Sequence, residues 1–166
     1  MNFVSVEFWI LVLLTVISCN ICKGKEHKHV ILFLTSCAFY GWWDVRFLGM
    51  VLAYTCITYF MTCKMGSGNK VMCGMHIVFS LLLLGGFKYY NFFIESINDI
   101  AGTRIRTLDI ILPLGISFYI LTAIGYVLDV YMGKYGAEKN FWKVATFIIY
   151  YPKMLSGPIE RGQRFF

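Results

Sequence analysis

The chain has 166 residues, of which 58% are hydrophobic and only 14% are charged, and its mean hydropathy is +0.67. A soluble domain carries about 45–50% apolar and about 25% charged residues. Because so few charges cannot cover a water-facing surface, the composition excludes a soluble globular domain. It indicates an integral membrane protein surrounded by the lipid bilayer.

The net charge of +6 comes from 15 Lys and Arg residues against 9 Asp and Glu residues. The basic residues stand in short breaks between apolar runs. This pattern is typical of the cytoplasmic loops of a membrane protein and not of a surface that follows phosphates. We therefore expect no nucleic-acid partner.

Six cysteines lie within or at the edges of the apolar runs, and no spacing joins them to His or Asp in a metal-site pattern. We expect no metal site and interpret the cysteines as small buried hydrophobic residues. They are Cys19, Cys22, Cys37, Cys56, Cys63 and Cys73.

Four apolar runs in the first half of the chain are candidates for membrane-spanning helices. The first covers residues 8–19 and extends to about residues 3–21, close to the roughly 20 residues that a span needs. It is not typical of a signal peptide, because its basic residues follow the run and no small-x-small cleavage site closes it. The other runs cover residues 30–43, 47–63 and 71–87. Residues 44–46 are expected to form a tight hairpin between the second and third spans.

Two basic loops indicate the orientation of these spans. The loops at residues 20–29 and 64–70 are separated by two spans, so both are expected on the same side of the membrane. The positive-inside rule makes that side cytoplasmic, which puts the N-terminus outside.

Residues 88–100 are predicted to form an amphipathic helix in the membrane interface. One face carries the polar side chains Lys88, Asn91, Glu95, Asn98 and Asp99. The other carries Tyr90, Phe93, Ile94, Ile97 and Ile100. The alternative is a frayed end of the fourth span.

Residues 110–130 are long enough to span but contain Pro113, Gly115 and Gly125. Since Pro113 has no amide hydrogen, the carbonyl of Asp109 would be freed within the helix. Taken alone, the pattern favours a packing helix kinked by proline. Asp109 and Asp129 are twenty residues apart, about 30 Å along a helix. They are therefore expected at opposite membrane faces and not as a catalytic pair.

The last stretch of the chain is too short and too broken to cross. Residues 141–151 form a short apolar run, and two prolines and a glycine interrupt the residues beyond it. We expect residues 141–166 to be re-entrant or the start of a longer buried unit, because irregular backbone at membrane depth must be buried. Glu160 and Arg161 bring charge next to an apolar segment, which indicates a substrate or ion pathway or a partner. The alternative is a cytoplasmic loop whose charges are solvated. The fold class predicted is all-α and polytopic, with about five transmembrane helices, an interfacial helix and a broken or re-entrant sixth segment.

Four motifs occur in order along the chain: Ala38-Phe-Tyr-Gly-Trp-Trp43; Phe87-Lys-Tyr-Tyr-Asn-Phe92; Leu112-Pro-Leu-Gly-Ile-Ser-Phe-Tyr119 with Tyr126-Val-Leu-Asp-Val-Tyr131; and Pro152 with Ser156-Gly-Pro-Ile-Glu-Arg161. Together they resemble the membrane-bound O-acyltransferase family. The most similar part of that family is the bacterial branch for alginate O-acetylation and teichoic-acid D-alanyl transfer. The resemblance runs from about Ala38 to Arg161, and four ordered motifs make it specific.

The resemblance implies a helical bundle around a tunnel in the bacterial inner membrane. An acyl group, expected to be acetyl, would pass from a cytoplasmic thioester donor to hydroxyls of an extracytoplasmic cell-envelope polysaccharide. The donor would be acetyl-CoA or an acyl carrier protein, with no bound cofactor. An extracytoplasmic acetyl-transfer protein is a further expected partner. The motif positions considered for substrate binding are Pro113, Gly115, Ser117, Tyr119, Asp129, Gly157, Pro158 and Arg161.

The histidine that the family uses as its general base lies downstream of the Gly157–Arg161 segment. We therefore expect residues 1–166 to be the N-terminal part of a single acyltransferase domain, inactive alone, with no catalytic residue carried over. His27 and His29 are interpreted as solvated loop residues, and His76 as a packing or hydrogen-bonding residue. The alternative is a small non-catalytic multi-pass membrane subunit or half of a transporter.

Overall fold

The computed structural model describes residues 6–22, 24–102, 106 and 113–153. All regular elements within these residues are helical, which confirms the all-α class. Their bounds are α1 (Val6–Ile21), α2 (Lys25–Trp43), α3 (Val45–Met65), α4 (Lys70–Leu84), a π-helical turn η1 (Gly85–Tyr89), α5 (Tyr90–Ala101), α6 (Ile116–Tyr131) and α7 (Phe141–Ile149).

Three of these helices begin at a side chain that accepts a hydrogen bond from their first turn. Asp44 accepts from the backbone N–H of Arg46 at 2.8 Å, so the chain reverses between α2 and α3 with no intervening loop. Asn69 caps α4 and Asn140 caps α7 in the same way. Such caps satisfy amide groups that the helix itself cannot. The hairpin predicted at residues 44–46 is confirmed.

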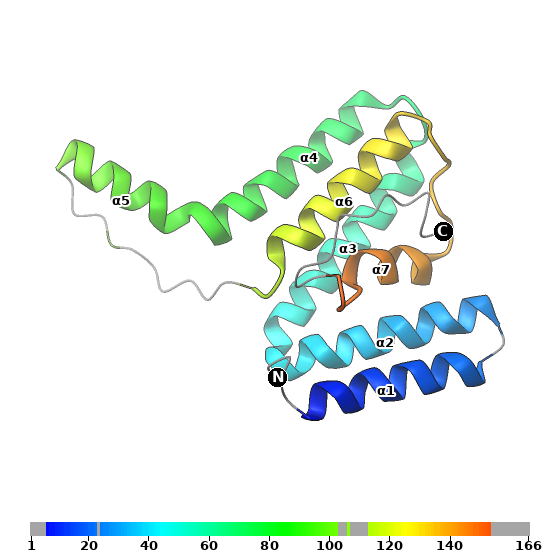
Figure 1. The fold of residues 1–166 in the computed structure, drawn as a ribbon. Coiled ribbons are helices and arrows are strands. Elements are labelled where there is room, and N and C mark those ends of the chain that lie inside the picture. The colour runs from blue at the N-terminus through cyan, green and yellow to red at the C-terminus, as the bar shows by residue number, and fades with distance from the viewer. Residues whose placement is uncertain (1–5, 23, 103–105, 107–112, 154–166) are drawn as a thin grey trace.

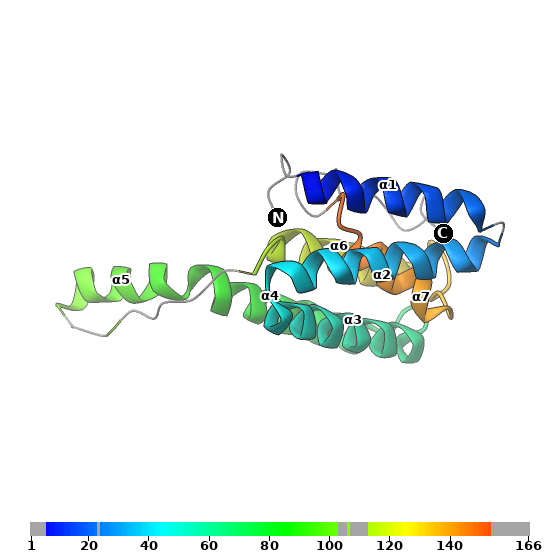
Figure 2. The same ribbon diagram turned by 90° about the horizontal axis from the view of Figure 1, so that it is seen from below.

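The helices form a bundle in which α7 lies at the centre (Figures 1 and 2). The short α7 packs against α2, α3 and α6, while α6 also packs against α3 and α4. Helix α1 lies beside α2 at one edge. The connections between α1 and α2, between α3 and α4 and between α6 and α7 all lie at the same end of the bundle (Figure 1). The two loops predicted to share one side of the membrane therefore lie at one end of the bundle.

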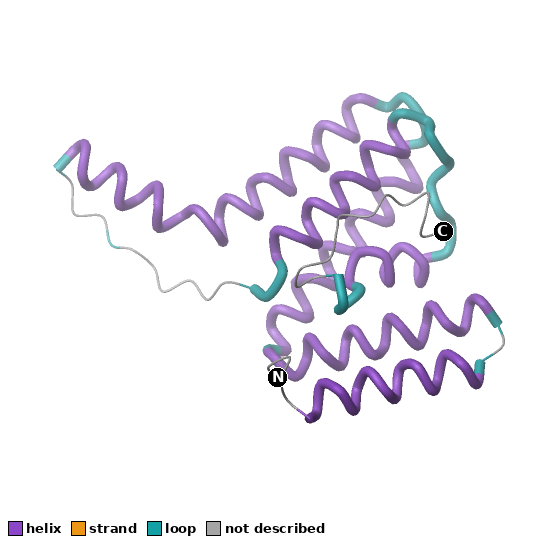
Figure 3. Tube along the Cα trace, in the orientation of Figure 1, coloured by secondary structure: helices purple, strands orange, loops and turns teal. Residues whose placement is uncertain are grey.

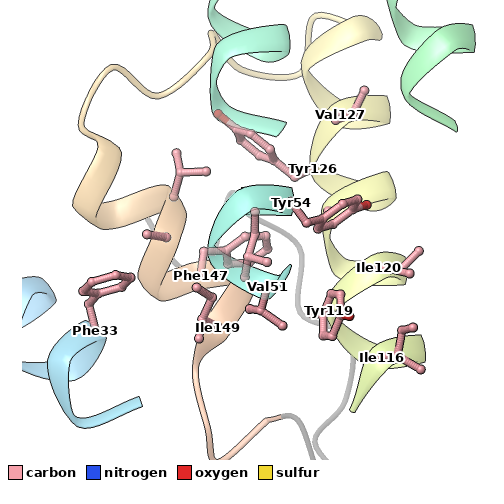
Figure 4. Close-up of a cluster of buried hydrophobic side chains, with 14 of the residues drawn as sticks. Phe33, Val51, Tyr54, Ile116, Tyr119, Ile120, Tyr126, Val127, Phe147 and Ile149 are labelled. Atoms are coloured by element: carbon pink, nitrogen blue, oxygen red, sulfur yellow. The ribbon is translucent and has the colours of Figure 1, made fainter. Parts of the chain in front are cut away.

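The core is built mainly from side chains of α3, α6 and α7 (Figure 4), and α2 contributes Phe33, Phe39 and Tyr40. Six consecutive residues of α7, Val144 to Ile149, are all buried. A helix lying against lipid exposes one face, whereas this nine-residue helix exposes almost none. It is therefore an interior element.

Within the described residues, two helical stretches are long and apolar enough to cross a membrane, Val45–Met65 and Lys70–Ile100, and α1 and α6 are shorter apolar helices. The outer face of α1 exposes large apolar side chains, namely Val6, Trp9, Leu13 and Ile17. These features support a membrane protein. The count of about five transmembrane helices is not confirmed.

Helix α4 continues into α5 through the π-helical turn, and the chain changes direction there (Figure 3). In a π-helical turn the backbone hydrogen bonds join residues five apart instead of four. Such a turn is a recognised cause of a helix kink. Helix α5 is regular over twelve residues and ends at Gly102, whose φ is +64°. Its exposed apolar side chains are Phe92, Phe93, Ile97 and Ile100. The predicted amphipathic helix is present, and it is not a frayed end of α4.

The prediction of a helix kinked at Pro113 is wrong. Helix α6 begins only at Ile116, after Pro113, and Asp109 lies outside the described residues. The reason is Gly115, whose φ of +68° is incompatible with a right-handed helix continuing backwards. Pro113 instead lies in the preceding turn, where its carbonyl accepts from the N–H of Ile116 at 3.3 Å.

Two further expectations are corrected. Helix α2 begins at Lys25, so His27 and His29 lie on a helix and not in a loop. The six cysteines are all free thiols, but only Cys73 is buried, and Cys63 is exposed. Apolar character alone did not distinguish a residue on the outer surface of the bundle from one inside it.

Candidate functional site

The turn that leads into α6 is held against α2 by one tyrosine. The hydroxyl of Tyr40 donates to the carbonyl of Leu114 at 2.8 Å. One residue later the carbonyl of Gly115 accepts from the N–H groups of Phe118 and Tyr119 at 2.9 and 3.1 Å. The first and third sequence motifs therefore meet at the start of α6.

The second motif reaches the same place through Lys88. Its Nζ lies 3.4 Å from the Oγ of Ser117, in the first turn of α6. The same ammonium lies 5.5 Å from the ring centroid of Tyr89. A cation thus lies beside the first turn of α6, and Lys88 contributes to this site although it was not among the candidate positions.

The residue just before Pro152 packs against α2 beside the first motif. The backbone N–H of Tyr151 donates to the Oγ of Ser36 at 3.3 Å. The ring of Tyr151 lies 5.5 Å from that of Phe39 and 6.1 Å from that of Phe8, measured between centroids. The chain leaving α7 is therefore anchored on α2 next to Tyr40.

We call these contacts the motif cluster, which consists of Ser36, Phe39, Tyr40, Lys88, Leu114, Ser117 and Tyr151. It joins segments that are far apart in the sequence, and its core members are shielded from the outer surface of the bundle. Of the candidate positions, Pro113, Gly115, Ser117 and Tyr119 lie at or beside it. Asp129 lies at the opposite end of α6, and Gly157, Pro158 and Arg161 lie outside the described residues.

His76 lies in a buried hydrogen-bonded network between α3 and α4. Its Nε2 lies 3.0 Å from the Oγ1 of Thr58, and its Nδ1 lies 3.3 Å from the Oγ of Ser80. Ser80 in turn lies 2.8 Å from the hydroxyl of Tyr54. Both ring nitrogens are therefore paired, as expected of a histidine with a structural hydrogen-bonding role.

Asp129 belongs to a polar cluster where α6 ends. Its Oδ1 lies 2.6 Å from the Nζ of Lys134, and the Asp129 side chain is only 8% exposed against 36% for Lys134. Nearby, the hydroxyl of Tyr126 accepts from the N–H of Glu138 at 3.1 Å. Burial, followed by the charge of the adjacent Asp129, raises the pKa of the Tyr135 hydroxyl. These contacts fold the loop between α6 and α7 back onto α6.

No group of three or more His, Cys, Asp or Glu side chains that could hold a metal ion occurs among the described residues. The chemistry of the motif cluster is limited to hydroxyl groups, backbone carbonyls and one ammonium. These groups can bind and orient polar atoms. They do not form a nucleophile–base pair of the kind that acyl transfer requires.

Comparison with known proteins finds relatives over most of the chain. A probable alginate O-acetylase, AlgI, of Pseudomonas aeruginosa is 33% identical over 171 residues, and the match covers 97% of this chain. The protein of the same name in Azotobacter vinelandii is 32% identical and covers 82% of the chain. A peptidoglycan O-acetyltransferase of Helicobacter pylori is 27% identical and covers 77%. No family model and no solved structure matches the chain.

The matches cover only 29–33% of the length of these curated relatives. The matches confirm the resemblance shown by the four motifs, and the chain belongs to the membrane-bound O-acyltransferase family.

Proposed function

We propose that this chain forms part of an acetyltransferase of the bacterial inner membrane. The whole protein would transfer an acetyl group from acetyl-CoA or an acyl carrier protein to hydroxyls of an extracytoplasmic cell-envelope polysaccharide. The observation that carries the proposal is the match to alginate O-acetylases over most of the chain. Because alginate and peptidoglycan, in the names of the relatives, are both envelope polysaccharides, we extend this acceptor class to the present chain.

In the proposed topology α1, α2, α3, α4 and α6 cross the membrane and α5 lies in its interface. The N-terminus lies outside, and the connections with the basic loops face the cytoplasm. Three connections at one end of the bundle support this arrangement. The interior position of α7 supports a re-entrant segment, since a nine-residue helix is too short to cross.

The motif cluster is the part of this chain that we assign to the substrate tunnel. Gly115 and the residues around it form a turn of backbone at the start of α6, with Ser117 and the ammonium of Lys88 on one side. Irregular backbone at membrane depth is stable where it is buried in protein or lines a cavity. We propose that Pro113, Gly115, Ser117 and Tyr119 form part of the tunnel wall. The acetyl group would then pass to an extracytoplasmic partner protein or directly to the polysaccharide.

The test is deletion of the gene in its host, followed by measurement of alkali-labile acetate on the purified envelope polysaccharides. We expect this acetate to be lost from one polysaccharide, and the intact gene to restore it. The amount of each polysaccharide is measured in parallel. Unchanged acetate with less exported polysaccharide would instead identify a transporter component and overturn the proposal.

A further inference from the structure

A groove of about 460 Å³ runs along α1, between that helix, α2 and the turn after α7. Phe8, Val12 and Val16 of α1 line its length, and Tyr151 forms part of the opposite wall. Thr15 also borders it, but its hydroxyl donates to the carbonyl of Leu11 at 2.7 Å. The part of the groove along α1 is therefore an apolar surface, and the hydroxyl of Thr15 beside it is already hydrogen-bonded.

One end of the groove is lined by polar side chains. Asn20 and Lys28 line it where α1 meets α2, at the end of the bundle that carries the two basic loops. Lys28 is an exposed residue on the first turns of α2. A lysine at this depth can extend its ammonium to the level of the lipid headgroups. The groove thus joins an apolar channel to the positive charge of Lys28.

The length of the groove is sufficient for one lipid acyl chain. Phe8 and Asn20 are twelve residues apart on α1, which is about 18 Å at 1.5 Å per residue. Half of a hydrocarbon core of about 30 Å is about 15 Å. The groove is therefore longer than one leaflet is deep, and one extended lipid acyl chain can lie along α1.

We propose that this groove is a specific binding site for a phospholipid with an anionic headgroup. One acyl chain lies along Phe8, Val12 and Val16, and the phosphate group pairs with Lys28. The charge of Lys28 at the polar end selects an anionic over a zwitterionic headgroup, because each lysine near the headgroups contributes to binding of anionic lipid. The site borders the motif cluster, with which it shares Tyr151, and lipid binding there does not depend on the acetyltransferase activity.

The experiment uses the 166-residue chain in phosphatidylcholine nanodiscs that contain a minor fraction of phosphatidylglycerol with a photoreactive acyl chain. After illumination, the labelled residues are identified by mass spectrometry. We expect label at Val12, Val16 and residues facing them, and we expect unlabelled phosphatidylglycerol to compete it away more effectively than unlabelled phosphatidylcholine. Label distributed equally over the outer face of α1 would mean ordinary surrounding lipid and would overturn the proposal.

Two matched pairs of variants sharpen the test. Val16→Trp fills the groove, whereas Ile17→Trp adds the same bulk on the outer face; the two residues are 51% and 52% exposed. We expect only the first to abolish the groove label. Lys28→Gln should weaken competition by phosphatidylglycerol about fivefold, with no such change for Lys64→Gln on α3. Thermal aggregation in detergent checks that each variant folds, and equal labelling of both tryptophan variants would refute the site.

Discussion

The hydroxyl of Tyr40 and the carbonyl of Leu114, 74 residues apart in the chain, are joined by a hydrogen bond of 2.8 Å. The bond links the last turn of α2 to the turn that begins α6. Tyr40 is almost completely buried, so the carbonyl of Leu114 would have little access to water if the hydroxyl were absent. This contact therefore determines where α6 starts relative to α2.

Tyr40→Phe should lower the free energy of unfolding by about 1–3 kcal/mol, because a buried carbonyl loses its partner. The measurement is unfolding in mixed detergent micelles with increasing dodecyl sulfate. Tyr89→Phe is the control, since Tyr89 is exposed and its ring, which lies beside Lys88, is retained. Equal stability of the two variants would show that the Leu114 carbonyl does not depend on Tyr40.

Gly115→Ala tests the left-handed backbone that ends the turn before α6. At a φ of +68°, a Cβ costs about 1–2 kcal/mol relative to glycine. The control lies on the same helix: Gly125 has an ordinary helical φ, and a Cβ added there has no neighbour within 4 Å. Gly125→Ala should be neutral or stabilising by up to about 1 kcal/mol. The same unfolding assay measures both, and an unchanged Gly115→Ala variant would contradict the assigned backbone.

The helices themselves could be predicted from the sequence because apolar runs, capping residues and helical periodicity are local properties. The hairpin at Asp44 and the amphipathic face of α5 are of this kind. The start of α6 could not be predicted from the sequence, because hydropathy does not indicate that the φ angle of Gly115 is positive. Proline in an apolar run favoured a kink, whereas the glycine two residues later instead determines where α6 begins.

The contacts of the motif cluster could not be predicted from local sequence patterns either, for a different reason. The pairs Tyr40 with Leu114 and Ser36 with Tyr151 arise from the packing of α2 against elements far along the chain. The motifs indicated which segments matter, but their spacing did not say which atoms meet. Lys88 belongs to the second motif and to the polar face of the amphipathic helix, but neither pattern predicted that its ammonium lies beside Ser117.

Thr58→Val tests the structural role of His76. The variant removes the 3.0 Å contact between the Thr58 hydroxyl and His76, which links α3 to α4. Hydrogen bonds between membrane helices contribute about 0.6 kcal/mol on average and at most about 1.7. Thr55→Val is a close control, because Thr55 is equally buried on α3 but its hydroxyl donates to the Val51 carbonyl of its own helix.

We expect the free energy of unfolding to fall more in Thr58→Val than in Thr55→Val, by about 0.6 kcal/mol and at most about 1.7 kcal/mol. Combining Thr58→Val with His76→Ala should then add less than the sum of the two single effects, because both remove the same contact. Strict additivity would mean that the two side chains do not interact.

The proposed orientation is tested by thiol labelling in intact cells. Cys63 is exposed in the last turns of α3, and Cys22 follows α1, so both lie near the end of the bundle assigned to the cytoplasm. Single-cysteine proteins retaining Cys22 or Cys63 should react with an impermeant maleimide only after the membrane is permeabilised. Cys73, which is buried, should react only after denaturation.

Asp99→Cys on the exposed face of α5 provides the opposite control in a cysteine-free protein and should react in intact cells. Labelling of Cys22 or Cys63 from outside would reverse the topology, because the connections beside these two cysteines lie at the same end of the bundle.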